Sequence, residues 1–375
     1  MKPLLTLKTN SLPGDIDIHS DLLSVLPSAL SRKRALKAGR EKQKRMQDSK
    51  GAGRCLLCDP AGNKPPGSSP CDIVIANRVA DFVNDFPYLP ADQRVLFLWH
   101  NDKSVRQAHL HRFRLRDLRR MELYWLVRGC IVRGEQYRSP NPKKHGDDQA
   151  PDLLRRAPDL MRMVVGFNLG GLAGQSIPHF HVQYGWEVVL NPRSFSPSQL
   201  QLYFEELVDS DLIIWQNDQV RIVAPWTPMG QFAIDLYFVG KYDICDLSDD
   251  DLKVFATFGH AIIQKYISLG IQNLNVVFTN SPDKKQIEPL VVHFVPRVNM
   301  TALYEIKGVN VVDTPPAKIA EEFRRVLSTG KEEINWSDLL KVAHDYNPDK
   351  EFLDVVRSSK KKGRKTVEKR RTKKR

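Results

Sequence analysis

Two histidines two residues apart, His179 and His181, stand in the stretch GQSIPHFHVQ. They could be metal ligands, a nucleophile with its support, or strand residues satisfied by hydrogen bonds in the core. Alternate residues of a β-strand share a face, so His179, His181 and Gln183 point to one side. A neutral imidazole is a nucleophile toward phosphorus near neutral pH. A glutamine amide can bind a phosphoryl oxygen, but it cannot hand a proton to a leaving group.

A glycine-rich segment, NLGGLAGQS, precedes this strand. Glycine allows close approach of the backbone, and exposed N–H groups with the Ser and Gln side chains could hold phosphate oxygens. A lone histidine would favour a role in the core, whereas these residue types at these spacings favour a phosphate-handling site. The candidate residues are Asn168, Gly170, Gly171, Gly174, Gln175 and Ser176.

Cys55 and Cys58 form a C-x-x-C pair before a stretch rich in Gly and Pro. Two thiolates at this spacing can hold one zinc ion from a turn, but two further ligands are required. A single pair is a weak signal, and free cysteines without a metal are the alternative. The chain has five cysteines in total, and this odd number favours a reducing compartment.

The elements that must position these residues occur twice along the chain. In both stretches the apolar patterns follow the order strand, strand, helix, strand, strand. The first set lies at 72–78, 94–99, 117–137, 162–168 and 179–189, and the second at 219–225, 232–239, 249–268, 273–280 and 289–297. His181 follows Asn168 by 13 residues, and His293 follows Asn280 by 13 residues. We therefore expect a duplicated α+β unit with mainly antiparallel sheets and helices packed on them.

The duplication and the composition suggest five segments. Residues 1–50 form a basic N-terminal extension, 51–200 the first unit with the active site, 201–310 a second, degenerate unit, 311–358 C-terminal helices expected on the second unit, and 359–375 a basic tail expected to be disordered alone.

The pattern N-x-G-x-x-x-G-x-S-x-x-H-x-H-x-Q, from Asn168 to Gln183, resembles the active-site signature of the histidine-triad superfamily. With glutamine as third member, it is similar to galactose-1-phosphate uridylyltransferases and dinucleoside polyphosphate phosphorylases, which are duplicated histidine-triad folds. The motif is specific, and the looser likeness covers roughly residues 50 to 300. The resemblance implies a nucleotidylyltransferase or phosphorylase with a covalent nucleotidyl-histidine intermediate. Its substrate would be a nucleoside diphosphate sugar or dinucleoside polyphosphate, and its acceptor phosphate or a sugar phosphate.

The resemblance also implies residue roles. His181 would be the nucleophile, Gln183 and Ser176 would hold the transferred phosphate, and Asn168 would orient the site. Cys55, Cys58, His100 and His179 would form a closed, structural Cys2His2 zinc site. His109 and His111 are rivals for His100, but their polar surroundings suggest that they face solvent.

The second unit departs from the pattern. Val291 stands where His179 stands in the first unit, and Val295 stands where Gln183 stands. Only His293 remains, so we expect this unit to be structural and catalytically inactive.

The net charge of +13 is concentrated in two appendages. Residues 32–50 carry +7 and residues 360–375 carry +10, which leaves −4 for the rest of the chain. Such runs can bind nucleic acid without sequence preference, so two alternatives stay open: a nucleotidyl hydrolase acting on nucleic-acid ends, and a non-catalytic nucleic-acid-binding protein.

The sequence contains no apolar run of the roughly 20 residues that cross a bilayer, and no secretory signal. We expect no membrane partner and a cytoplasmic location, or a nuclear one in a eukaryote. Edge strands of such sheets could pair subunits into a homodimer.

Overall fold

The computed structural model describes the chain in fifteen ranges, and the basic runs and Ser176 lie outside them. The ranges are 5–8, 17–20, 28–30, 55–60, 71–84, 91–111, 114–139, 161–175, 177, 179–188, 197–226, 228–279, 289–298, 314–327 and 333–358. Near the N-terminus, β1 (Leu5–Lys8), β2 (Asp17–Ser20) and β3 (Ser28–Leu30) form a small antiparallel sheet. Within the described ranges, no helix has the length and apolar character to cross a membrane.

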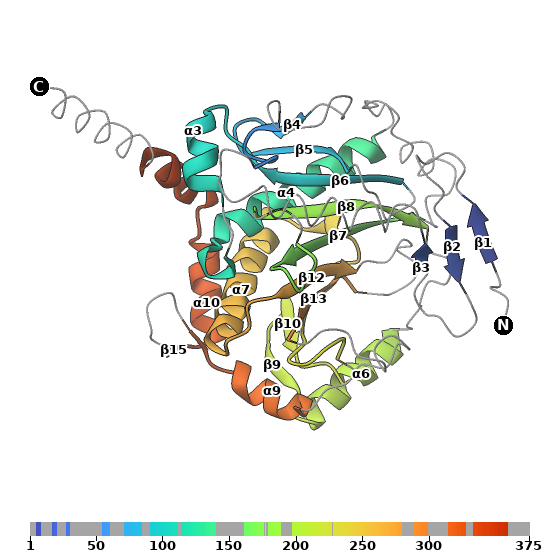
Figure 1. Ribbon diagram of the computed structural model, residues 1–375. Coiled ribbons are helices and arrows are strands. Elements are labelled where there is room, and N and C mark those ends of the chain that lie inside the picture. Colours follow the sequence, from blue (N-terminus) through green and yellow to red (C-terminus); the bar gives the residue numbers. More distant parts are fainter. Residues whose placement is uncertain are drawn as a thin grey trace, which may run out of the picture.

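A ten-stranded antiparallel sheet forms the centre of the fold (Figure 1). In spatial order its strands are β4 (Asp72–Ile75), β5 (Val79–Val83), β6 (Ala91–Leu98), β8 (His181–Val188), β7 (Met161–Leu169), β12 (Leu274–Thr279), β13 (Val291–Pro296), β11 (Ile234–Phe238), β10 (Val220–Val223) and β9 (Ile213–Gln216). Helices pack on this sheet, so the expected α+β class with a mainly antiparallel sheet is confirmed.

The two halves of this sheet repeat one topology on either side of the central β7–β12 pair. In each half three strands precede a long helix and two strands follow it, with α4 (Arg120–Arg138) in the first and α7 (Asp249–Ser268) in the second. The third strand lies beside the last strand in both halves. We expected only two strands before each helix. The pattern missed β5, which a short turn separates from β4, and the four-residue β9.

α4 and α7 lie together on one face of the sheet and cover its main apolar core (Figure 1). Ser248 caps α7 by accepting a hydrogen bond from the Asp251 N–H, and the Asp251 carboxylate accepts from the Ser248 N–H at 2.8 Å. A Cβ on Gly259 of α7 would lie 3.4 Å from Phe294 and 3.6 Å from Leu123, so this glycine allows close packing.

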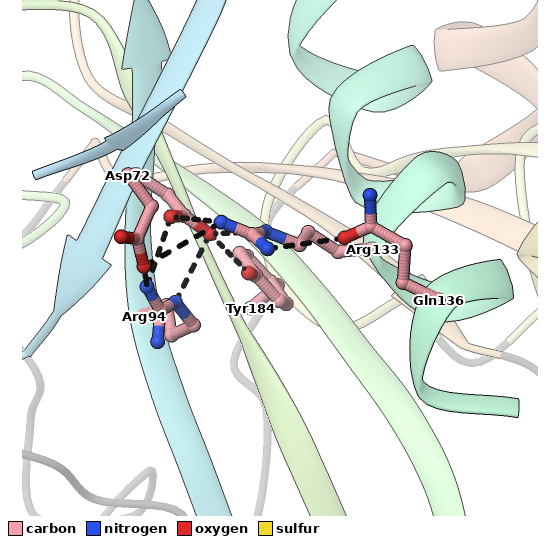
Figure 2. A network of polar contacts seen from close by, with 6 residues as sticks. Asp72, Arg94, Arg133, Gln136 and Tyr184 are labelled. Atoms are coloured by element: carbon pink, nitrogen blue, oxygen red, sulfur yellow. Dashed lines mark hydrogen bonds and ion pairs between the residues drawn. The ribbon is translucent and has the colours of Figure 1, made fainter. Parts of the chain in front are cut away.

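A buried ion-pair network ties α4 to the first half of the sheet (Figure 2). Asp81 accepts hydrogen bonds from Nε and Nη2 of Arg94, both at 3.0 Å, and from Nε and Nη2 of Arg133, at 2.9 and 2.8 Å. The Tyr184 hydroxyl donates to the same carboxylate at 2.6 Å, and Asp72 accepts from Arg94 at 2.6 Å. Burial alone would raise the pKa of Asp81, but the two guanidinium groups hold it below its usual value.

Shorter elements connect and flank these units. They are α3 (Lys103–Val105), the π-helical turn η2 (Arg106–Leu110), the 3-10 turns η3 (Leu115–Asp117) and η5 (Ile244–Asp246), α6 (Pro197–Asp209), α9 (Pro316–Phe323), β14 (Val326–Leu327), β15 (Glu333–Ile334) and α10 (Trp336–His344).

The C-terminal helices contact both halves of the sheet. Trp336 of α10 packs against Phe258 of α7, with ring centroids 5.4 Å apart, as expected for helices on the second unit. A last helix, 348–358, lies instead against the first half, where Asp349 forms an ion pair with Arg78 at 2.7 Å. The expectation that all these helices pack on the second unit is therefore wrong for the last one.

Candidate active site and metal centre

His181 begins β8 and lies on the face of the sheet opposite α4 and α7, because its neighbours Phe180 and Val182 point into the helix-covered core. Its side chain is 3% exposed, and its Nδ1 lies 2.7 Å from the carbonyl oxygen of His179. A carbonyl oxygen only accepts, so Nδ1 carries the proton and Nε2 carries the lone pair. Burial lowers the pKa of His181 to about 4, which keeps the imidazole neutral near neutral pH.

Gln175 holds the same carbonyl group from a second direction. Its Nε2 donates to the His179 carbonyl oxygen at 3.2 Å, and its Oε1 accepts from the Gly170 N–H at 2.7 Å. We expected Gln175 to bind substrate. Its buried amide is engaged at both ends, and it fixes the carbonyl group that orients His181; a contact with substrate stays a prediction.

The loop at 170–175 reverses the chain after β7, and its glycines serve this turn. Gly170 has φ +97°, and a Cβ there would lie 2.4 Å from the Asn273 side-chain oxygen; Gly174 has φ +88°. A Cβ on Gly171 would meet nothing within 4 Å. We expected free N–H groups here for phosphate, but four of them already donate to protein acceptors: those of Gly170, Leu172, Gly174 and Gln175.

Asn168 and Gln183 lie on the same face of the sheet as His181. The β7–β8 register pairs Gly166 with Gln183, so that Asn168, two residues further along β7, lies opposite His181. Both polar side chains are half-buried. The predicted phosphate contact Ser176 lies outside the described residues.

Four potential metal ligands converge beside the histidine strand: Cys55, Cys58, His111 and His179, all buried and with ligand atoms within 4.8 Å of one another. The Nδ1 atom of His179 lies 3.5 Å from both sulfur atoms, and that of His111 lies 3.2 Å from the Cys58 sulfur. Usual Zn–S and Zn–N lengths in a tetrahedron separate sulfur and nitrogen ligands by about 3.5 Å. The cluster therefore fits a four-coordinate zinc ion.

His111 takes the place that we expected for His100. The chain turns through η2, where the Arg106 side chain donates from Nε to the Cys58 carbonyl oxygen at 2.7 Å. The backbone carbonyl oxygen of Arg106 accepts from the His111 N–H at 3.0 Å. This turn brings His111 against the cysteines. His100 precedes α3, and its Nδ1 accepts a backbone hydrogen bond at 3.1 Å. The expectation that His109 and His111 face solvent is also wrong, because they are 6% and 7% exposed.

The two thiols hold their protons unequally. The hydrogen bond from Cys58 lowers the pKa of Cys55, and this effect outweighs that of burial. The same hydrogen bond, together with burial, raises the pKa of Cys58. Two sulfur atoms thus stand next to two imidazole rings, a donor set suited to a soft cation. His179 serves both sites, since its ring faces the cysteines and its carbonyl group faces His181.

His293 of β13 is the histidine that remains at a motif position in the second half, and both of its ring nitrogens are engaged. Nδ1 lies 2.8 Å from an Asp235 carboxylate oxygen and Nε2 lies 2.9 Å from the Thr279 hydroxyl. Burial opposes protonation, but Asp235 raises the pKa of His293 above its usual value. Val277 lies opposite His293, and Asn280, the expected asparagine of this copy, lies outside the described residues. This arrangement leaves His293 no lone pair for nucleophilic attack.

Comparison with known proteins supports the fold. No protein-family model matches the sequence, and no curated protein matches it. A galt-like protein from Arabidopsis thaliana is 16% identical, with 67% of this chain and 85% of that chain covered and a TM-score of 0.50. An ADP-glucose phosphorylase from Arabidopsis thaliana, solved with bound ADP-glucose, is also 16% identical, with 72% and 94% covered and a TM-score of 0.51. The fold expected from the histidine motif is therefore confirmed.

Proposed function

We propose that this protein is a nucleotidylyltransferase or phosphorylase that transfers a nucleoside monophosphate through a covalent intermediate on His181. The hydrogen bond from Nδ1 to the His179 carbonyl oxygen, 2.7 Å long, is the observation that carries this proposal. It directs the lone pair to Nε2 on a sheet face where Asn168 and Gln183 offer polar groups. The fold likeness to an ADP-glucose phosphorylase adds support.

In the first half-reaction, the Nε2 lone pair forms a bond to the α-phosphorus of a nucleoside diphosphate sugar or dinucleoside polyphosphate. The bond from this phosphorus to the bridging oxygen breaks, and its electron pair leaves on a sugar phosphate or a nucleotide. The imidazole gains positive charge with its Nδ1 proton in place, and the His179 carbonyl oxygen faces that charge. In the second half-reaction, an oxygen of phosphate or of a sugar phosphate bonds to phosphorus, and the electron pair of the P–N bond returns to Nε2.

Gln183 favours transfer to such acceptors. A phosphate leaving group departs as a stable anion and needs no proton in the transition state. Gln183 offers a hydrogen-bond donor to a phosphoryl oxygen but cannot titrate, so it suits this leaving group. Ser176 would be a second phosphate contact.

We also propose that Cys55, Cys58, His111 and His179 bind zinc. Four protein ligands leave no open coordination position, so the ion would be structural. When bound, it would remove the remaining thiol proton and hold the N-terminal loop against the histidine strand. The residues of this chain then keep the His179 carbonyl group in position to orient His181.

The test uses the full-length protein and a panel of nucleoside diphosphate sugars and dinucleoside polyphosphates labelled at the α-phosphorus. We expect an acid-labile protein–nucleotide adduct that phosphate or a sugar phosphate discharges. His181→Ala should abolish it, and the matched variant His293→Asn should keep it, because both nitrogens of His293 bind other side chains.

Three results would contradict the proposal. An active protein whose His181→Ala variant kept full activity would exclude His181 as the nucleophile. An adduct that only water discharges would favour a hydrolase. The absence of any adduct, together with retention of RNA through the basic tails, would favour a nucleic-acid-binding protein.

A further inference from the structure

We propose that Asn275 and Arg297, two residues of the second half of the sheet, determine the orientation of the Asn168 side-chain amide in the first half. This inference rests on the proposed function, since it makes the Asn168 side-chain NH2 group a donor to the transferred phosphoryl group. It gives the catalytically inactive half a positioning role in the active site.

A chain of three side chains crosses the middle of the sheet. Asn275 of β12 lies directly opposite Asn168 of β7. Its Nδ2 donates to the Asn168 side-chain oxygen at 2.7 Å and to the Ala173 carbonyl oxygen at 2.9 Å. Its own side-chain oxygen accepts from Nε of Arg297, just after β13, at 2.6 Å. The amide of Asn275 is thus engaged at both ends.

The chemistry of these partners allows only one orientation of the Asn275 amide. A guanidinium group donates and never accepts, and a backbone carbonyl group accepts and never donates. If the amide turned over, its NH2 group would face the Arg297 donor and its oxygen would face the Ala173 carbonyl oxygen. Both hydrogen bonds would then be replaced by repulsive contacts. Arg297 and Ala173 therefore determine that Asn275 presents a donor to Asn168.

The orientation of the Asn275 amide determines the orientation of the Asn168 amide. Asn168 must present its side-chain oxygen to Asn275, so its NH2 group is turned away from β12. Within the described part of the chain, this NH2 group has no hydrogen-bond partner, and Asn168 lies opposite His181. A donor at this place can bind an oxygen of a phosphoryl group on Nε2 of His181. A reversed amide would point an oxygen lone pair at that anionic group.

Charge-reversing and charge-conserving variants of Arg297 test the inference. Arg297 is exposed, so neither variant should unfold the protein. Arg297→Lys keeps a group that only donates, and we expect adduct formation within about threefold of the wild-type rate. Arg297→Glu presents only acceptors, which favours the reversed amide. The rate of adduct formation should then fall about 10- to 100-fold, the effect of losing one hydrogen bond to a charged group.

Asn275→Asp provides a second perturbation at constant shape. The new carboxylate forms an ion pair with Arg297 but cannot donate to Asn168, so Asn168 turns over to donate to it. We again expect a fall of about 10- to 100-fold in the adduct rate, with an unchanged zinc content. The unfolding midpoint should fall as well, because the new carboxylate cannot donate to the Ala173 carbonyl oxygen. In an Asn168→Ala background the same change should have little further effect, because the residue that it acts through is gone.

The outcomes separate the two proposals. Wild-type adduct rates in both Arg297→Glu and Asn275→Asp would overturn this inference and leave His181 as the nucleophile. Equal losses in Arg297→Lys and Arg297→Glu would also overturn it, because they would indicate a requirement for the guanidinium itself. A wild-type protein that forms no adduct would overturn the proposed function and this inference with it.

Discussion

The carboxylate of Asp81 is the point where the stability of this fold can be tested most directly. It accepts hydrogen bonds from two guanidinium groups and one phenol, and its side chain is fully buried. Asp81→Asn keeps the size of the side chain but removes its charge. Asp72 then still forms ion pairs with Arg94 and Arg133, whose side chains are 1% and 2% exposed.

The expected loss of stability follows from this geometry. Removal of one partner of a buried ion pair costs about 3–5 kcal/mol, because an uncompensated charge stays buried. Asp72 offsets part of this cost. It lies 2.6 Å from Arg94 and 3.7 Å from Arg133, but its side chain is 23% exposed and therefore weaker in its effect. We expect a loss of about 3 kcal/mol in the free energy of unfolding, which is roughly a 150-fold change in the unfolding equilibrium.

Urea denaturation, followed by tryptophan fluorescence, measures this loss. With a slope of about 3 kcal/mol per molar urea, the midpoint should fall by about 1 M. Asp72→Asn is the matched control, and its loss should stay below about 1 kcal/mol because Asp72 is partly exposed. A loss for Asp81→Asn below about 1 kcal/mol, or equal to that of the control, would refute the reasoning.

The pH dependence gives an independent check. Since the folded-state pKa of Asp81 lies below its unfolded value, the carboxylate contributes stability above the unfolded pKa of about 4. This contribution is lost as the pH falls through the folded-state pKa. The stability difference between wild type and Asp81→Asn should be constant from about pH 8 to pH 5 and shrink below about pH 4. A difference that grew on acidification would contradict this assignment.

Three further predictions concern the site. His111→Ala should abolish zinc binding, whereas His100→Ala should keep it, as measured by mass spectrometry of the native protein. The reverse result would identify His100 as the ligand. Gly170→Ala should lower the free energy of unfolding by about 2–4 kcal/mol, because this position has a positive φ and a side-chain oxygen approaches it closely. Gly171→Ala is the control, and because the space around it is open it should lower the free energy of unfolding by less than about 1 kcal/mol. Gln175→Met should slow adduct formation about tenfold at unchanged zinc content, because the His179 carbonyl group, which orients His181, loses one hydrogen bond. An unchanged rate would show that Gln175 does not position His181.

Local patterns in the sequence predicted the elements that carry the site. The capping box at Ser248 placed the start of α7, and strand alternation placed His181 and Gln183 on one face. These signals act over a few residues, so the sequence alone contains them. The repeated order of strands and helices predicted the duplication for the same reason, although it missed two short strands.

The sequence could not identify the fourth member of the metal cluster. The family resemblance made His100, which ends an apolar run, the expected ligand, whereas His111 lies in a polar stretch. The choice depends on the π-helical turn between them and on the hydrogen bond from Arg106 to the Cys58 carbonyl oxygen. Such a contact joins segments that lie 48 residues apart, and local propensity does not encode it.

The sequence by itself determined which residue types could do chemistry: two histidines on one strand with a glutamine two residues beyond the second, a glycine turn before them, and a pair of cysteines. Only the tertiary structure decided how these residues are held. Gln175 binds the His179 carbonyl group, and the last helix packs on the first half of the sheet. Asn275 donates a hydrogen bond to Asn168 across the central strand pair. The physical reason is the same in each case. Hydrogen bonds and ion pairs between distant segments depend on strand register and chain reversal, which the whole fold fixes together.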